Sequence, residues 1–278
     1  MTQEKSFFVF CNEEIDSNFV YVSPSIKRVL GYEPTEWLES TMAAYCHPEE
    51  LALGRLLSAY LLKKDYLVHG SNLHVLHKNG EFITLEAIIS SCYNLRAITF
   101  AQIDQDQIGQ TKRSRTVDKW FVFKTDGQVT ARNLSPNNHA LLARLEHELN
   151  SGESIQLTPQ PRVILALQTG SDPTIMYASC LSETLLGANN EKLIGEKFTT
   201  FVHPDQKEYV LSKFSQLQED PHVAHMSFLF DSNTSWVKLM AVCWSCSDAI
   251  LVTACHDQNR GHLRHIMDSG SSTSDVDV

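Results

Sequence analysis

The sequence lacks several features that would assign it to a membrane or nucleic-acid class. No apolar run approaches the roughly 18 residues that a membrane-spanning helix needs, and Met1–Lys5 are too polar to open a secretory signal peptide. Basic residues are in the minority, 23 against 33 acidic ones, for a formal net charge of −10. Because nucleic acid demands a basic surface, we expect no membrane partner and no direct contact with nucleic acid.

The cysteines show no disulfide framework. Seven is an odd number, and the residues are scattered along the chain. We therefore expect reduced thiols and a location in the nucleus and/or the cytoplasm. The cysteines are Cys11, Cys46, Cys92, Cys180, Cys243, Cys246 and Cys255.

Signs of an active site are also missing. Glycines occur singly and form no phosphate-binding loop, and no serine or cysteine nucleophile has a recognisable base beside it. The sequence therefore predicts a protein that is not an enzyme.

The chain instead contains an internal repeat. A shift of 156 residues carries Tyr21 onto Tyr177 and His47 onto His203 without a gap, and a shift of 154 carries Phe82 onto Trp236. We refer to residues 1–105 as the first repeat, 160–258 as the second repeat and 106–159 as the connecting segment. Residues 259–278 form a polar, acidic tail that we expect to be disordered.

Each repeat reads as a hairpin, several short helices and three further strands. In the first repeat, Phe7–Phe10 and Phe19–Val22 alternate with polar turns, and the later strands are expected at 71–77, 81–91 and 95–102. The second repeat predicts its closing strands at 222–230, 236–244 and 249–256. His47 and His203 precede prolines, as residues that cap helices do.

These motifs resemble the PAS domain, over residues 5–105 and 160–258. The first repeat is most similar to PAS domains of fungal white-collar regulators and of basic helix-loop-helix PAS factors. The resemblance implies an α+β fold with two PAS-like domains, each a five-stranded antiparallel sheet with short helices on one face. The residues that carry it are Tyr21, Ser23, Pro24, Gly31, His47 and Pro48, then Tyr177, Ser179, Gly187, Gly195, His203, Pro204 and Asp205.

The first repeat departs from the family pattern ahead of His47. It has Glu39 where the second repeat has Gly195, so we expect a different local backbone there. Flavin photosensors of this superfamily place a cysteine three residues after the glycine, but the matching residues are Met42 and Phe198. We therefore predict no cofactor and disfavour a flavin adduct.

Haem or a small ligand stays an open alternative. Haem needs an axial ligand, and several histidines fall in or beside strands, where packing or solvent-facing roles are the ordinary expectation. These are His69, His74, His77, His222 and His225. A zinc or redox switch at Cys243, Cys246 and Cys255 has suitable residue types, but burial as small apolar side chains is the favoured interpretation.

The connecting segment has its own pattern. Lys112–Arg115 is a basic cluster, interpreted as a solvated loop in preference to a nuclear-import signal. Trp120–Phe123 and Val129, around a turn at Asp126, predict an extra hairpin. A helix is expected with one face formed by Leu141, Leu142, Leu145 and Leu149, either packed on a sheet or used for dimerisation.

The sequence thus predicts a signalling or regulatory protein that acts by PAS-mediated association, with itself or another PAS protein, in transcriptional regulation. The alternative is a PAS sensor whose small-molecule or haem ligand controls association. Aromatic residues of the closing strands are the expected partner-binding anchors, since aromatics dominate interface energetics. They are Phe82, Tyr93, Trp236 and Trp244.

Overall fold

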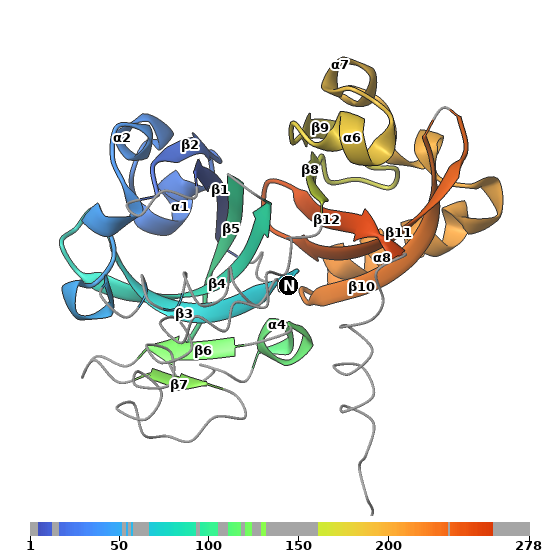
Figure 1. The fold of residues 1–278 in the computed structure, drawn as a ribbon. Helices are drawn as coiled ribbons and strands as arrows, with labels where there is room; N and C mark the ends of the chain where they lie inside the picture. Colours follow the sequence, from blue (N-terminus) through green and yellow to red (C-terminus); the bar gives the residue numbers. More distant parts are fainter. Residues whose placement is uncertain are drawn as a thin grey trace, which may run out of the picture.

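The computed structural model describes residues 5–12, 17–51, 54, 57, 67–92, 95–104, 111–117, 120–123, 129–131, 161–232 and 234–257. In these residues each repeat contributes one sheet, and the two sheets lie side by side (Figure 1). The strand orders are β2-β1-β5-β4-β3-β6-β7 and β10-β11-β12-β8-β9. Among the described residues, no helix is long and apolar enough to cross a membrane.

The first sheet is built from β1 (Ser6–Asn12), β2 (Phe19–Val22), β3 (His69–Leu76), β4 (Phe82–Cys92) and β5 (Leu95–Gln102). The helices between β2 and β3 include α1 (Ile26–Leu30), α2 (Pro34–Leu38) and η1 (Met42–Ala44), followed by a helix that begins at Pro48. This is the expected order of hairpin, short helices and meander, and the α+β architecture is confirmed.

The second sheet repeats the design with β8 (Arg162–Leu167), β9 (Ile175–Ala178), β10 (Val223–Asp231), β11 (Trp236–Ser245) and β12 (Ile250–His256). Its helices are α6 (Ser182–Leu186), α7 (Asn190–Leu193), η3 (Phe198–Phe201), η4 (Pro204–Gln206) and α8 (Lys207–Glu219). Its strands pair in the same register as the equivalent strands of the first repeat.

Glycine ends the first helix of both repeats. Gly31 and Gly187 are left-handed C-caps, with φ of 81° and 67°. A Cβ added to Gly187 would lie 2.6 Å from the Ser232 carbonyl oxygen. A larger residue there would therefore both clash with Ser232 and strain the left-handed backbone. Glu39 has φ of −89° where Gly195 has +90°, which confirms the expected backbone difference between the repeats.

The connecting segment adds α4 (Lys112–Thr116), β6 (Trp120–Phe123) and β7 (Val129–Ala131). β6 and β7 form the expected hairpin, and β6 pairs in parallel with β3. The first sheet therefore has seven strands where the PAS resemblance implied five. Trp120 lies directly over Gly70, and a Cβ added to Gly70 would be 2.1 Å from the indole. Only a glycine leaves room for the indole at this position. The helix expected at Leu141–Leu149 and the tail lie outside the described residues.

One face of each sheet holds the core of its own repeat. In the first repeat Phe7, Trp37 and Phe100 form an aromatic cluster with stacked and edge contacts. In the second repeat Phe198 and Phe230 lead a similar cluster beneath the helices. Each sheet therefore has an inner face under its helices and an outer face directed away from them.

Candidate functional site at the interface between the two repeats

The outer faces of the two sheets pack against each other. A single buried apolar cluster contains residues of both sheets and the indole of Trp120 from the connecting segment. Each repeat thereby buries its second sheet face on the other repeat. The fully or almost fully buried members of this cluster are Phe8, Phe10, Leu67, Val68, Ile88, Cys92, Ala97, Trp120, Ile164, Ala166, Val223, Val242, Trp244, Cys246, Ala249, Leu251 and Cys255.

Buried hydrogen bonds cross the centre of this interface, and two of them join repeat-equivalent residues. The Thr253 hydroxyl donates to Ser90 Oγ at 2.8 Å, and Ser90 Oγ in turn donates to the Leu67 carbonyl at 2.7 Å. The Trp244 indole N–H donates to Thr99 Oγ1 at 2.9 Å. Buried polar groups destabilise a fold unless they are bonded, so these contacts specify how the two faces register.

The two hydrogen bonds are related by the internal repeat. The shift of 154 carries Ser90 onto Trp244 and Thr99 onto Thr253, and the register of β4–β5 with that of β11–β12 confirms both correspondences. Position 90 of the first repeat thus contacts the threonine of the second, while its equivalent contacts the threonine of the first. Such an exchange is the signature of a two-fold, isologous interface. The chain therefore contains the contacts of a pseudo-symmetric dimer.

Aromatic side chains continue the interface at one side. Phe10 lies between Tyr21 of its own repeat and Tyr177 of the other, with ring centroids 5.9 and 4.6 Å apart. Burial is the main cause that raises the pKa of both tyrosines, and thiols and Asp248 nearby add to it. Both phenols therefore stay protonated and neutral at physiological pH.

Polar side chains bond the rim. Ser6 and Ser247 exchange backbone-to-hydroxyl hydrogen bonds of 3.2 and 2.9 Å. The Asp248 carboxylate accepts from the Ser25 amide at 3.2 Å and from the Ser25 hydroxyl at 2.7 Å. The apolar centre and bonded rim have the anatomy of a specific protein interface.

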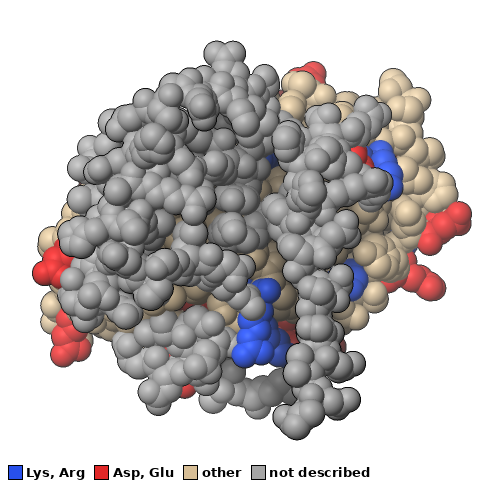
Figure 2. Space-filling view, turned by 60° about the horizontal axis from the view of Figure 1, so that its bottom comes forward, with Lys and Arg blue, Asp and Glu red and all other residues tan. Residues whose placement is uncertain are grey.

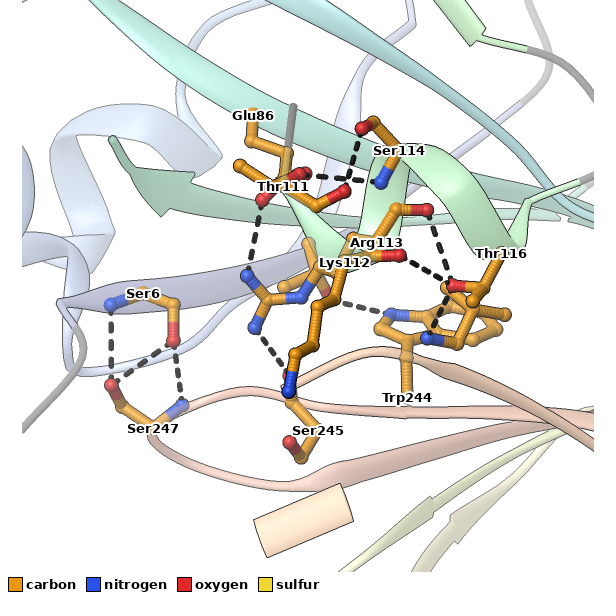
Figure 3. A network of polar contacts seen from close by, with 12 residues as sticks. Ser6, Glu86, Thr111, Lys112, Arg113, Ser114, Thr116, Trp244, Ser245 and Ser247 are labelled. Carbon is orange, nitrogen blue, oxygen red and sulfur yellow. Dashed lines mark hydrogen bonds and ion pairs between the residues drawn. The ribbon is translucent and has the colours of Figure 1, made fainter. Parts of the chain in front are cut away.

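Helix α4 joins both repeats through a buried arginine (Figure 3). Arg113 donates from Nη1 to the Glu86 carboxylate at 3.2 Å and from Nη2 to the Ser245 carbonyl at 3.2 Å. Glu86 is also bonded by the hydroxyl of Thr111, the N-cap of α4. The side chains of Arg113 and Glu86 are both buried, so the guanidinium neutralises a carboxylate within the interface.

The remainder of α4 is bonded to the second repeat. Thr116 Oγ1 accepts from the Val223 amide at 3.0 Å, and the Thr116 carbonyl is 3.1 Å from His225 Nε2. Lys112 forms an exposed ion pair with Asp220. The basic cluster Lys112–Arg115 is therefore a helix with a buried arginine, and its interpretation as a solvated loop was wrong, because the charge of Glu86 binds it.

Comparison with known proteins assigns the fold of the first repeat. Residues 19–95 match the family model described as the PAS fold. The first repeat contains a PAS domain. The second repeat has the same strand order and register, so it is a second PAS-like domain.

Two solved structures are similar over about a third of the chain. The PAS-B domain of Drosophila melanogaster Cycle, with bound ethylene glycol, is 10% identical with a TM-score of 0.29, covering 32% of this chain and 94% of that one. The PAS domain of the Cronobacter turicensis quorum-sensing receptor RpfR, in complex with BDSF, is 14% identical with a TM-score of 0.31, covering 35% and 94%. No curated protein matches the chain.

The expected anchor residues of the PAS domains fall in different places. Phe82 and Trp236 are 41% and 45% exposed, and each ring meets the equivalent histidine, His47 or His203, edge-on at 4.7 Å. Trp244 is fully buried between the two repeats, so its side chain is not exposed to an external partner. Tyr93 lies outside the described residues.

The cysteines proposed as a zinc or redox switch do not converge. Cys243 faces the inner core of the second PAS-like domain, whereas Cys246 and Cys255 face the interface. Burial raises the pKa of the Cys246 thiol to about 12 and that of Cys243 well above its ordinary value. Within the described ranges, no three His, Cys, Asp or Glu side chains are placed to hold a metal ion.

The described histidines have several different roles. His203 accepts from the Asp205 amide at 3.4 Å, as expected of a helix cap. His69 and His74 are buried in β3, in agreement with the expected packing role.

On the face shown in Figure 2, basic side chains lie toward the middle and acidic ones mainly at the rim. The described residues that are visible show no broad basic patch on that face.

Sequence reasoning missed the polar centre of the interface. Thr99 and Thr253 are identical residues under the shift of 154, so the repeat itself carried a signal for them. Glu86 and Arg113 gave no comparable signal, because they are 27 positions apart and only the fold brings them together.

Proposed function

We propose that this chain is a non-enzymatic signalling or regulatory protein that acts through protein association. The observation that supports the proposal is the pairing of the two outer sheet faces through repeat-equivalent contacts. In this arrangement the outer sheet face of each repeat is occupied by the other repeat. An external partner, another PAS protein or a second copy, then uses surfaces that stay exposed, and Phe82 and Trp236 are the candidate anchors.

The process that we propose is transcriptional regulation, in the nucleus and/or cytoplasm. The support is the similarity of Tyr21, Ser23 and His47, with their neighbours, to white-collar and basic helix-loop-helix PAS sequences. With its acidic net charge, the chain contacts DNA through a partner under this proposal.

The substitution Thr253→Arg tests the pairing. Thr253 is fully buried against Ser90, so an arginine there leaves a charge without a partner and forces the faces apart. We expect faster amide hydrogen exchange in β4, β5, β11 and β12 and a larger radius of gyration in X-ray scattering. Thr234→Arg, at an exposed threonine of the same repeat, is the matched control.

A cross-link guards against a variant that simply unfolds. In the wild-type protein a carbodiimide should join Lys112 to Asp220, which pair across the interface. Absence of that cross-link, with unchanged exchange in Thr253→Arg, would mean that the faces do not pair in solution.

A small-molecule sensor is the second candidate, supported by one buried donor in the first PAS domain. Trp37 is fully buried and stacks on Tyr45 at 4.5 Å, and its indole N–H has no hydrogen-bond partner among the described residues. The second repeat has the buried, apolar Leu193 at the equivalent position. A ligand with an acceptor atom, haem or a smaller molecule, would satisfy this N–H.

Native mass spectrometry tests the sensor. We expect purified protein to carry noncovalent mass above the 31.4 kDa chain, and Trp37→Leu, which introduces the residue of the second repeat, to lose it. Bare wild-type protein under nondenaturing conditions argues for association alone.

A further inference from the structure

The two outer faces are alike in backbone but unlike in side-chain size. Ser90 and Trp244 are repeat-equivalent, and so are Ala97 and Leu251, which the β-ladders place on the neighbouring strands. All four are buried in the interface. In both cases the small residue belongs to the first repeat and the large one to the second.

The contacts place a large side chain against a small one. Trp244 bonds Thr99 on β5, where the next residue on the same face of the strand is only Ala97. Ser90 is bonded to Thr253 on β12, where the same-face neighbour is Leu251. Each of these two contacts between the sheets therefore combines one bulky and one small residue.

Like-with-like pairing would lose this fit. If two copies of the second face paired, Trp244 of each copy would pack on the strand that carries Leu251 of the other, so that large side chains would meet large ones. Two copies of the first face would place Ser90 on the strand of Ala97 twice and leave voids. Overpacking and voids are both destabilising in close-packed interiors.

We infer that the outer faces select each other and reject copies of themselves, so that the partner of the first face is a PAS-type sheet with a bulky side chain at the position of Trp244. This inference rests on the proposed function and names its pairing rule. A second copy of the chain can use these faces only by exchanging repeats, as in a swapped dimer. At both positions like-with-like dimerisation through these faces loses the size match.

Exchanging the two side chains in the full chain tests this rule. Ser90→Trp makes both faces bulky and Trp244→Ser makes both small, so each alone should lower the urea midpoint of unfolding. The double variant Ser90→Trp with Trp244→Ser restores one large and one small residue. We expect it to recover at least half of the summed loss in midpoint.

Two conservative variants separate size from hydrogen bonding. Trp244→Phe keeps the bulk but removes the N–H, and Ser90→Ala removes only the hydroxyl. Both should cost less than Trp244→Ser if size sets the pairing.

The outcomes also separate this inference from the proposed function. Additive losses in the double variant overturn the size rule. If Thr253→Arg nevertheless disrupts the interface as expected, the proposal that the faces pair still stands. A concentration-dependent wild-type dimer in native mass spectrometry, with Trp244 cross-linked to Trp244 by photo-oxidation, likewise overturns the size rule.

Discussion

Glu50 and Gln206 occupy equivalent positions in the two repeats but accept a hydrogen bond from the equivalent strand amide with different side chains. Gln206 Oε1 accepts from the Leu229 amide at 2.7 Å, and Glu50 Oε2 accepts from the equivalent His74 amide at 3.0 Å. Glu50 also bonds the imidazole of His74, for which Leu229 has no counterpart. A neutral amide is therefore enough for the fold, and the buried carboxyl group is an addition of the first repeat.

The same difference recurs at two further pairs of positions. His69 is equivalent to Ala224, and Glu86 is equivalent to Met240. His69 and Glu86 are both buried. The two repeats thus share a backbone while the first carries buried titratable groups where the second is neutral. At these positions the stability of the first repeat should depend on charge and pH, and that of the second should not.

Arg113 should give the largest effect, because its removal leaves the Glu86 carboxylate buried in the interface. Arg113→Ala is expected to lower the free energy of unfolding by about 3–5 kcal/mol in urea titrations. Arg115→Ala, at an exposed position of the same helix, should change it by less than about 0.5 kcal/mol.

Introducing the second repeat's solution sharpens the test. Glu86→Met together with Arg113→Met should come within about 1 kcal/mol of the wild type or exceed it, since apolar replacements of buried ion pairs are often neutral. A double variant as unstable as Arg113→Ala would mean that the charge is not the cause.

His69 should make the first PAS domain sensitive to acid. Burial, with a smaller effect of Arg96, lowers the pKa of its imidazole to about 3, so the folded state holds it neutral. The unfolded chain takes up a proton near pH 6.5, and stability is therefore fully present above that pH and lost as pH falls toward 3. The expected loss from His69 is about 3 kcal/mol between pH 7 and pH 4.

Substituting the second repeat's residue measures that contribution. His69→Ala should flatten the acid limb of a plot of unfolding free energy against pH, whatever its cost at neutral pH. An unchanged slope would show that the acid sensitivity arises elsewhere.

Glu50 should give the smallest effect when its acceptor oxygen is kept. Glu50→Gln with His74→Leu, the pair found in the second repeat, should cost less than about 1 kcal/mol in thermal or urea unfolding. Glu50→Ala alone should cost about 1–3 kcal/mol, because the His74 amide then loses its buried acceptor. Equal losses from both variants would contradict the claim that the amide is sufficient.

Much of the fold could be predicted from local signals. The period-two runs gave the strands within about two residues, and Gly31 and Gly187 end helices because only glycine takes up the left-handed conformation without strain. The hairpin of β6 and β7 was also predicted. Its parallel pairing with β3 was not, since residues about fifty positions apart leave no local trace of their contact.

The candidate site was harder to predict. Alternation along β11 places Trp236 and Trp244 on the same face, yet one is 45% exposed and the other fully buried. Position along the strand decides this, because only the end near Trp244 meets the other sheet. No property of the tryptophans themselves distinguishes them.

The sequence by itself determined the repeat, the order of elements in each copy and the residues available to both sheet faces, because these depend on periodicity and turn chemistry within short windows. Only the tertiary structure decided that the outer faces pair with each other and that Arg113 neutralises Glu86 between them. Such contacts join residues remote in the chain, and their energy depends on the burial and complementary shape that appear once both sheets have formed.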